Sequence, residues 1–257
     1  MSLELRLSVN PFYTYIIGAD RPIGQLLART LAAGNHLYRG FGIESRERIA
    51  IQVNGQPFFV LAPSVFSDVD LHESAYWIES LLEHDAPIVL LSSLAVFGVV
   101  EGGRHDESSR RYSESPLARR LLQLEDMVRR ARRHIILRVG LNFSVQAGDF
   151  AHALLTTIRD KGELVVDDHE LFSPTPDDDI ATVLVAILKQ LDCTDTLWGT
   201  YHFCGVEPTT SYRFAEALLA EAGQYEDLSE VRLIADDGAF KPVVRVPCGD
   251  NTSLFHT

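Results

Sequence analysis

Short apolar runs alternate along this chain with segments of helical periodicity, and this rhythm limits the fold more than any other feature of the sequence. In the segments between the runs, apolar residues recur at spacings of three and four, which places them on one face of a helix. Strands that alternate with helices are typical of βαβ units around a mostly parallel sheet. We therefore predict an α/β fold, a doubly wound parallel sheet with a small C-terminal α+β lobe. The predicted strands cover residues 12–17, 36–40, 58–62, 88–93, 135–139, 163–166 and 201–203, and the predicted helices cover residues 23–33, 73–84, 116–133, 149–160, 180–191 and 212–222.

The chain length suits one α/β domain with an appended lobe. It has 257 residues, of which 46% are hydrophobic, so it can bury a core without disulfides or metals. The regular βαβ rhythm stops near residues 145–148, and the later elements are shorter and mixed. We therefore predict a nucleotide-binding core over residues 1–146, and a segment over residues 147–257 that contributes late strands and a substrate lobe.

Composition excludes several classes of partner. The net charge of −13 argues against nucleic acid, because affinity for phosphate backbones comes from an excess of Lys and Arg. The apolar runs are far shorter than the roughly 20 residues needed to cross a bilayer, and no signal peptide begins the chain. The three cysteines, Cys193, Cys204 and Cys248, have no metal-binding spacing, so we expect free thiols, no metal site and a reducing cytoplasm.

Two glycines, Gly18 and Gly24, bracket the turn between the first strand and the first helix. In dinucleotide-binding Rossmann folds such a turn needs glycine for the tight bend, for the approach of backbone to pyrophosphate, and for the packing of helix on strand. Here Arg21 occupies the middle position, where its side chain either blocks the phosphate or pairs with it. The candidate cofactor-binding residues are Gly18, Arg21, Ile23 and Gly24; the alternative is a strand–helix turn that binds nothing.

The end of the second strand indicates which dinucleotide would bind. An acidic residue there favours NAD, because its carboxylate accepts a hydrogen bond from the ribose hydroxyl. An arginine there can instead bind the extra phosphate of NADP. This strand ends Tyr38-Arg39-Gly40, with no acid before Glu44. If a cofactor binds, it is NADP or NAD, and Arg39 favours NADP.

Three later stretches carry a resemblance to a known family. They are the strand and loop LLSSLAVFG at 90–98, the segment LVVDDHELFSPTPDDDIA at 164–181, and GTYHFCG at 199–205 followed by TSYRFA at 210–215. Together with Lys241-Pro242, they resemble the dTDP-4-dehydrorhamnose reductases among the extended short-chain dehydrogenases. The resemblance implies a nicotinamide cofactor and a nucleotide-sugar substrate, with Ser173 and Thr175 as candidate substrate-binding residues.

The same resemblance implies a catalytic Ser or Thr followed by Tyr-x-x-x-Lys on the next helix. In that family the tyrosine protonates the sugar carbonyl oxygen, and the lysine lowers the tyrosine pKa and holds the nicotinamide ribose. Ser93 matches the first position, and Glu125 matches a glutamate of the helix motif. This alignment places Leu117 at the tyrosine position and Leu121 at the lysine position. Neither leucine can move a proton, so the resemblance predicts a catalytically impaired member of the family.

Three functions therefore remain open at this stage. The first is a non-catalytic protein that binds NAD(P) or a nucleotide-sugar, as a regulatory or scaffolding subunit. The second is an active reductase or epimerase with a displaced acid, Tyr112, served by Arg119 or Arg120. The third is a structural module without ligand that dimerises through the helix at 116–133, whose end is rich in arginine.

Acidic residues cluster at Asp167-Asp168 and at 177–179. They could suggest a cation site, but their match to the family segment favours a loop and a helix N-terminus. Ser173, Thr175 or Asp177 would then cap the helix that follows.

Overall fold

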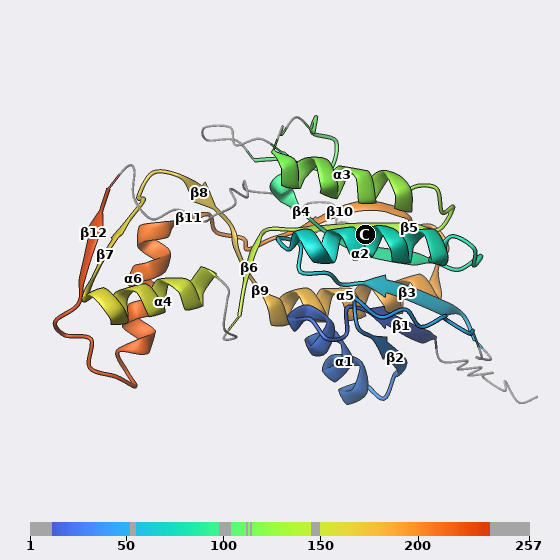
Figure 1. Cartoon of the computed structure of the whole chain (residues 1–257), viewed down its shortest axis with the longest axis horizontal. Helices are drawn as coiled ribbons and strands as arrows, with labels where there is room; N and C mark the ends of the chain where they lie inside the picture. The colour runs from blue at the N-terminus through green and yellow to red at the C-terminus, as the bar shows by residue number, and fades with distance from the viewer. Residues whose placement is uncertain are drawn as a thin grey trace, which may run out of the picture.

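The fold is built on a six-stranded, fully parallel sheet, shown in Figure 1. The structure is a computed structural model, and it describes residues 12–51, 55–97, 104–111, 113, 115–144 and 150–236. Across the sheet the strands run β10 (Gly199–Phe203), β5 (His134–Val139), β4 (Ile88–Ser93), β3 (Pro57–Leu61), β1 (Tyr13–Ile17) and β2 (Leu37–Phe41). The predicted doubly wound sheet is confirmed.

Helices cover both faces of this sheet. On one face α1 (Pro22–Ala33) packs against α5 (Asp177–Cys193), and on the other α2 (Asp68–Leu81) packs against α3 (Pro116–Val128) (Figure 1). Because both faces are covered, the central strands are apolar throughout rather than alternating. β3 and β4, for example, are buried along almost their whole length.

The order of the strands fixes where a ligand can bind. β1 pairs with β2 on one side and with β3 on the other, so the connections leave β1 in opposite directions. In open α/β sheets ligands sit at this switch point, outside the carboxyl ends of the strands. Here the switch point lies between the turn after Ile17 and the segment that follows Leu61.

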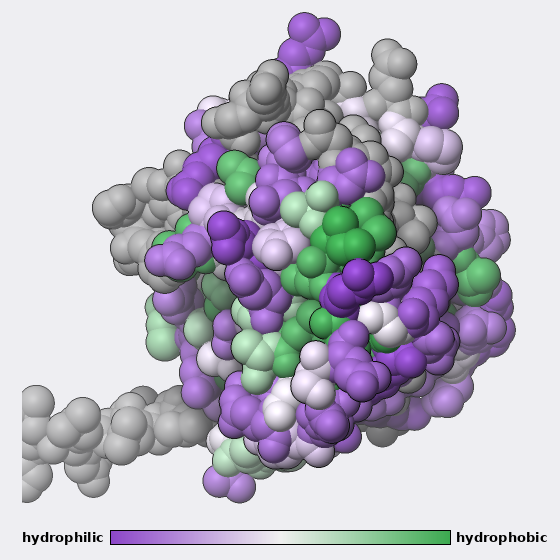
Figure 2. All heavy atoms as spheres, turned by 90° about the vertical axis from the view of Figure 1, so that its left-hand side faces the viewer, coloured by the Kyte–Doolittle hydropathy of each residue, from purple (hydrophilic) through white to green (hydrophobic). Residues whose placement is uncertain are grey.

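A smaller lobe lies beside the sheet, at the left of Figure 1. It holds α4 (Phe150–Lys161), α6 (Ser211–Ala222) and two short strand pairs, β7 (Glu163–Val166) with β12 (Arg232–Ala235) and β8 (Leu171–Phe172) with β11 (Thr209–Thr210). A separate small core fills it, made of Leu154, Ile158, Leu164, Val166 and Ala215. Figure 2 views this end of the molecule, where a patch of apolar residues lies within a largely hydrophilic surface.

Chain order and spatial order differ after residue 147. α5 and β10 come late in the chain, yet they belong to the core beside α1 and β5. A third short pair, β6 (Leu141–Phe143) with β9 (Pro174–Pro176), lies between the core and the lobe. The predicted boundary at 145–148 falls outside the described residues.

Several predicted boundaries were wrong by a few residues. α2 begins at Asp68, not 73, because Ser67 caps it by accepting a hydrogen bond from the Asp70 amide. α3 ends at Val128, not 133, and β2 continues to Phe41. The cap predicted for α5 is absent, since its N-cap residue is Pro176 and Asp177 is the first helical residue.

Among the described residues, none of the helices combines the length and the apolar character that a membrane crossing requires. Cys193 is exposed and Cys204 is buried, and both are free thiols. Cys248 lies outside the described residues. The described part of the chain also contains no group of three or more His, Cys, Asp or Glu side chains that could hold a metal ion.

Candidate site at the sheet switch point

Both glycines of the turn are required by packing. Gly18 has a φ of +88°, which side chains rarely adopt, and a Cβ there would lie 2.5 Å from the carbonyl oxygen of Ala62. A Cβ on Gly24 would overlap the carbonyl oxygen of Gly18. The two glycines thus let β1, β3 and α1 pack closely, whether or not a ligand is bound. Ile23 is buried in the same core.

Arg21 lies between the two glycines and reaches across the switch point. Its guanidinium pairs with Asp70 of α2 through two hydrogen bonds, from Nε to Oδ2 at 2.8 Å and from Nη2 to Oδ1 at 3.0 Å. It also bonds Asp20 at 2.9 Å and Glu44 at 3.0 Å. We call Arg21, Asp20, Glu44 and Asp70 the arginine clasp.

Asp70 is the buried member of the arginine clasp, with 2% of its surface exposed. Its carboxylate also accepts hydrogen bonds from the Ser64 amide at 2.9 Å and from the Ser67 hydroxyl at 3.2 Å. Burial alone would raise the pKa of Asp70, but the bonds from Arg21 and Ser64 outweigh it and lower that pKa. The hydrogen bond to Asp70 in turn raises the pKa of Arg21 above its ordinary value. The pair is therefore ionised at neutral pH.

Arg39 lies within β2, two residues before the strand ends. Its guanidinium is 3.2 Å from Glu47 and lies over the Phe41 ring, 4.9 Å from the ring centroid. The end of β2 instead meets Asp20, whose carboxylate accepts a hydrogen bond from the Ile43 amide at 2.9 Å. The carboxylate of Asp20 therefore lies at the end of β2, although the sequence of that strand has no acidic residue before Glu44.

Ser93 ends β4 and is fully buried. Its hydroxyl accepts a hydrogen bond from the Ala95 amide at 3.2 Å, which caps the short 3₁₀ turn η1 (Leu94–Val96), and it donates to the Val139 carbonyl at 3.5 Å. α3 packs against β4 and η1. On that helix Leu121 is buried and Leu117 half-buried, both within the apolar core.

No ammonium group reaches this place from the described residues. Lys161 ends α4 in the lobe, and Lys189 lies on α5, on the face of the sheet opposite α3. Tyr112, the candidate displaced acid, lies outside the described residues. Arg119 and Arg120 are exposed on α3, and Arg120 pairs with Asp68 at 3.3 Å.

A buried polar network lies beneath Ser93. Glu125 of α3 accepts hydrogen bonds from Arg138 at 2.9 and 2.7 Å and from the Ser92 hydroxyl at 2.8 Å. His202 of β10 lies 3.3 Å from Arg138. These side chains are almost fully buried and bond to one another, so they tie α3 to three strands. The network stabilises the core and offers no group to a ligand.

Ser173 and Thr175, the candidate substrate-binding residues, are buried around the β6–β9 pair. The Thr175 hydroxyl donates to the Ser173 carbonyl at 3.1 Å and accepts from the Gly205 amide at 3.2 Å. Asp177, next along the chain, accepts from the Asn142 amide at 2.7 Å. These bonds hold the junction of core and lobe; contact with a substrate stays a prediction.

Sequence reasoning missed the partners of the glycine turn. Asp70 and Glu44 lie 49 and 23 residues from Arg21, so no local motif joins them. The signal that could have found Asp70 is its place in the first turn of a helix that follows a strand beside β1. Arg138 was more readily detectable, because a charge inside an apolar strand requires a buried partner.

The whole chain was then compared with known proteins. A sequence model of one family, described as the RmlD substrate binding domain, matches residues 67–247, well over half of the chain. The chain belongs to the RmlD substrate binding domain family. The match begins at Ser67, so it is carried by the residues after the glycine turn and the first three strands.

Relatives of this RmlD-family chain agree with the assignment. A dTDP-4-dehydrorhamnose reductase of Aggregatibacter actinomycetemcomitans is 25% identical over 248 residues, covering 85% of this chain and 82% of the relative. A dTDP-4-dehydrorhamnose reductase structure from Clostridium acetobutylicum superposes with a TM-score of 0.78 at 16% identity, covering 95% and 92% of the two chains. The reductase of Bacillus anthracis, solved in complex with NADP, gives a TM-score of 0.76 at 15% identity, covering 96% and 93%.

Proposed function

We propose that this protein is a non-catalytic, dTDP-4-dehydrorhamnose reductase-like member of its family that binds a nucleotide-sugar without reducing it. The observation that carries the proposal is the apolar pair Leu117 and Leu121, which stands on α3 where the family resemblance places the tyrosine and lysine. Leu121 is buried in the core and Leu117 packs against it, and neither side chain can donate or accept a proton. The proposed role is a regulatory or scaffolding subunit.

The chemistry of Ser93 supports this reading. A serine hydroxyl has a single proton to donate and cannot supply the acid that a carbonyl reduction needs without a partner of suitable pKa. The Ser93 hydroxyl is already engaged with Ala95 and Val139. It holds the loop after β4 in place and moves no proton.

The proposed ligand follows from the family. Its relatives are named for a dTDP-linked keto sugar, and one was solved with NADP. These names support a nucleotide-sugar, and also a nicotinamide cofactor, NADP or NAD. The glycine turn does not fit the pyrophosphate of that cofactor, because its Arg21 is paired with three carboxylates, those of Asp20, Glu44 and Asp70. When bound, such a cofactor supplies hydride.

The direct test combines binding with turnover. We expect dTDP-rhamnose to raise the melting temperature by several degrees, since ligand at about 100 times its Kd adds about 2.7 kcal/mol. We expect no oxidation of NADPH when dTDP-4-dehydrorhamnose is added. Turnover that disappears in Tyr112→Phe would establish the rival, an active reductase with a displaced acid. If the melting temperature did not change, the result would favour the third function, a structural module without ligand.

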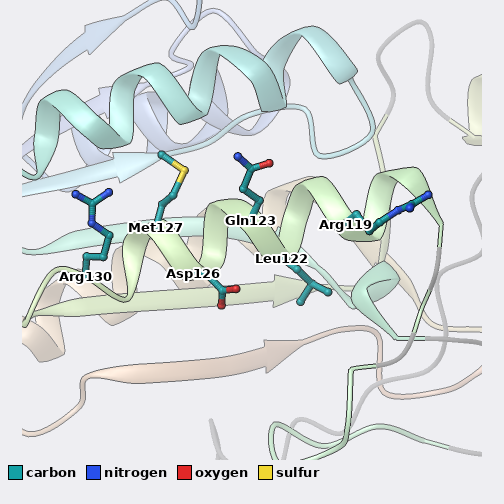
Figure 3. A pocket seen from close by; sticks show the side chains of 6 residues that line it. All are labelled: Arg119, Leu122, Gln123, Asp126, Met127 and Arg130. Atoms are coloured by element: carbon teal, nitrogen blue, oxygen red, sulfur yellow. The ribbon is translucent and has the colours of Figure 1, made fainter.

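We also propose a homodimer through α3. Its outer face is hollowed around Leu122 and Met127, and Figure 3 looks onto it. Arg119 and Arg130 lie near its two ends, with Asp126 between them. Within the protomer Asp126 pairs with Arg129 and Arg130 pairs with Glu79, so Leu122 and Met127 would supply the contact with a second copy across a two-fold axis.

A further inference from the structure

We infer that the arginine clasp closes the glycine turn, so that this protein binds no dinucleotide at the switch point of its sheet. The inference deepens the proposed function: it rests on that function only for the remaining ligand, a nucleotide-sugar held without cofactor. The fold and the relatives support a nicotinamide cofactor at this place, and the arginine clasp argues against one.

The arginine clasp lies where the pyrophosphate of a dinucleotide would bind. A dinucleotide bound to this fold lies across the switch point, with its pyrophosphate against the turn after the first strand. Arg21 belongs to that turn, and Asp70 belongs to the first turn of α2, the helix that follows β3. Because β1 and β3 flank the switch point, the Arg21–Asp70 pair spans the crevice that the pyrophosphate would enter.

The Arg21 guanidinium is also already bonded. A guanidinium has five N–H donors, and that of Arg21 makes four hydrogen bonds to carboxylates of Asp20, Glu44 and Asp70. Two of them form a bidentate pair with Asp70, the strongest geometry for such contacts. For Arg21 to bind phosphate, it would have to leave Asp70 buried without a counter-charge, which is costly.

The net charge of the arginine clasp also disfavours a phosphate. The arginine clasp contains three carboxylates and one guanidinium, so it is net negative. Nearby cations do not reverse this balance, because Arg46 pairs with Glu73 and Arg120 with Asp68. A pyrophosphate would therefore meet the like charge of Asp20 and Glu44 rather than a free cation.

The test is a titration with NADPH, followed by its fluorescence, on the full chain. We expect the wild type to show no saturable binding up to about 1 mM NADPH. The double substitution Arg21→Gly with Asp70→Asn removes the guanidinium and leaves no buried charge unpaired. We expect this open-turn variant to bind NADPH at least about tenfold more tightly than the wild type. Asp70→Asn alone removes the bidentate partner of Arg21 and leaves only the exposed Asp20 and Glu44, so it should shift affinity in the same direction, and it serves if the double variant does not fold.

Arg46→Gly is the matched control, because it also removes an arginine from an ion pair near the turn and should leave NADPH affinity unchanged. Micromolar binding of NADPH by the wild type would overturn the inference. So would a folded open-turn variant, or a folded Asp70→Asn, that binds no better than the wild type. Failure of the proposed function has a separate readout, since it appears as sugar reduction or as the absence of a melting shift with dTDP-rhamnose.

Discussion

Two buried carboxylates, Asp70 and Glu125, each hold an arginine in this protein. Glu125 is fully buried, and burial alone would raise its pKa, but the bonds from Arg138 and Ser92 outweigh it and lower that pKa. A buried pair is costly to break, because the remaining charge has neither water nor partner. Both pairs therefore fix geometry, one at the glycine turn and one beneath α3.

Removing Arg138 tests the second pair. We expect Arg138→Met to lower the free energy of unfolding by about 3 kcal/mol, because Glu125 would stay buried with only the partly exposed Arg129 and Arg111 as counter-charges. Arg130→Met is the control; it breaks the exposed pair with Glu79 and should cost about 0–1 kcal/mol. Urea unfolding measures both. Equal losses in the two variants would show that the buried pair is not special.

His202 gives the protein a pH dependence of known sign. Burial lowers the pKa of His202 to about 4, below its ordinary 6.5. Between those values the unfolded chain binds more protons than the folded one, so the free energy of unfolding falls as pH drops from about 6.5 toward about 4. At pH 5 the loss from this group is about 2 kcal/mol.

We expect His202→Gln to lose less melting temperature between pH 7 and pH 5 than the wild type. The exposed His72, changed to Gln, should leave the wild-type slope intact. Asp70 and Glu125 have lowered pKa values, so they act at pH values below their ordinary range and do not obscure the comparison. An unchanged slope in His202→Gln would contradict this assignment.

At the scale of elements, long periodic segments could be predicted from the sequence and short ones could not. The six sheet strands and the six helices were expected from their apolar spacing. The two- and three-residue strands β6, β8, β9 and β11 were not, because so short a segment has no periodicity to detect. The end of α3 was misplaced, because its arginines continue the polar face beyond Val128, where the chain turns into β5.

The junction of core and lobe depends on one small residue between β5 and β6. A Cβ on Gly140 would lie 2.5 Å from the Thr175 hydroxyl and 2.6 Å from the Ser173 carbonyl oxygen. We expect Gly140→Ala to destabilise the protein by about 1–3 kcal/mol through overpacking. Gly223→Ala is the control, since its nearest neighbour is 3.2 Å away, and it should change stability by less than about 0.5 kcal/mol.

The proposed dimer contact through α3 can be tested by substitution on the outer face of that helix. Leu122→Glu with Met127→Glu places two acids in the hollow that a second copy would fill. We expect this variant to be monomeric by light scattering, with a somewhat lower melting temperature because both side chains also pack against the core of their own protomer. Tyr225→Glu, an exposed residue after α6, should leave the dimer intact. A wild type that is monomeric at all concentrations would refute the dimer.

For the whole molecule, the sequence was sufficient for the architecture, while the residues that it assigns to the site stay predictions. The βαβ rhythm fixed the sheet, and the helix motif around Glu125 placed Leu117 and Leu121. The closure of the glycine turn could not be predicted, because Arg21 was equally compatible with binding and with blocking phosphate. Only the fold brings Asp70, 49 residues away, into contact with it.

The central claim is that none of the described residues beside Ser93 can relay a proton, and one measurement tests it independently of cofactor affinity. The open-turn variant, saturated with NADPH, is mixed with dTDP-4-dehydrorhamnose, and NADPH absorbance is followed over a single turnover. We predict no oxidation of NADPH above the rate measured without protein. The bound NADPH can offer a hydride, but the protein still has no acid to protonate the carbonyl oxygen of the sugar. Oxidation at enzymatic rate, abolished by Tyr112→Phe, would contradict the account.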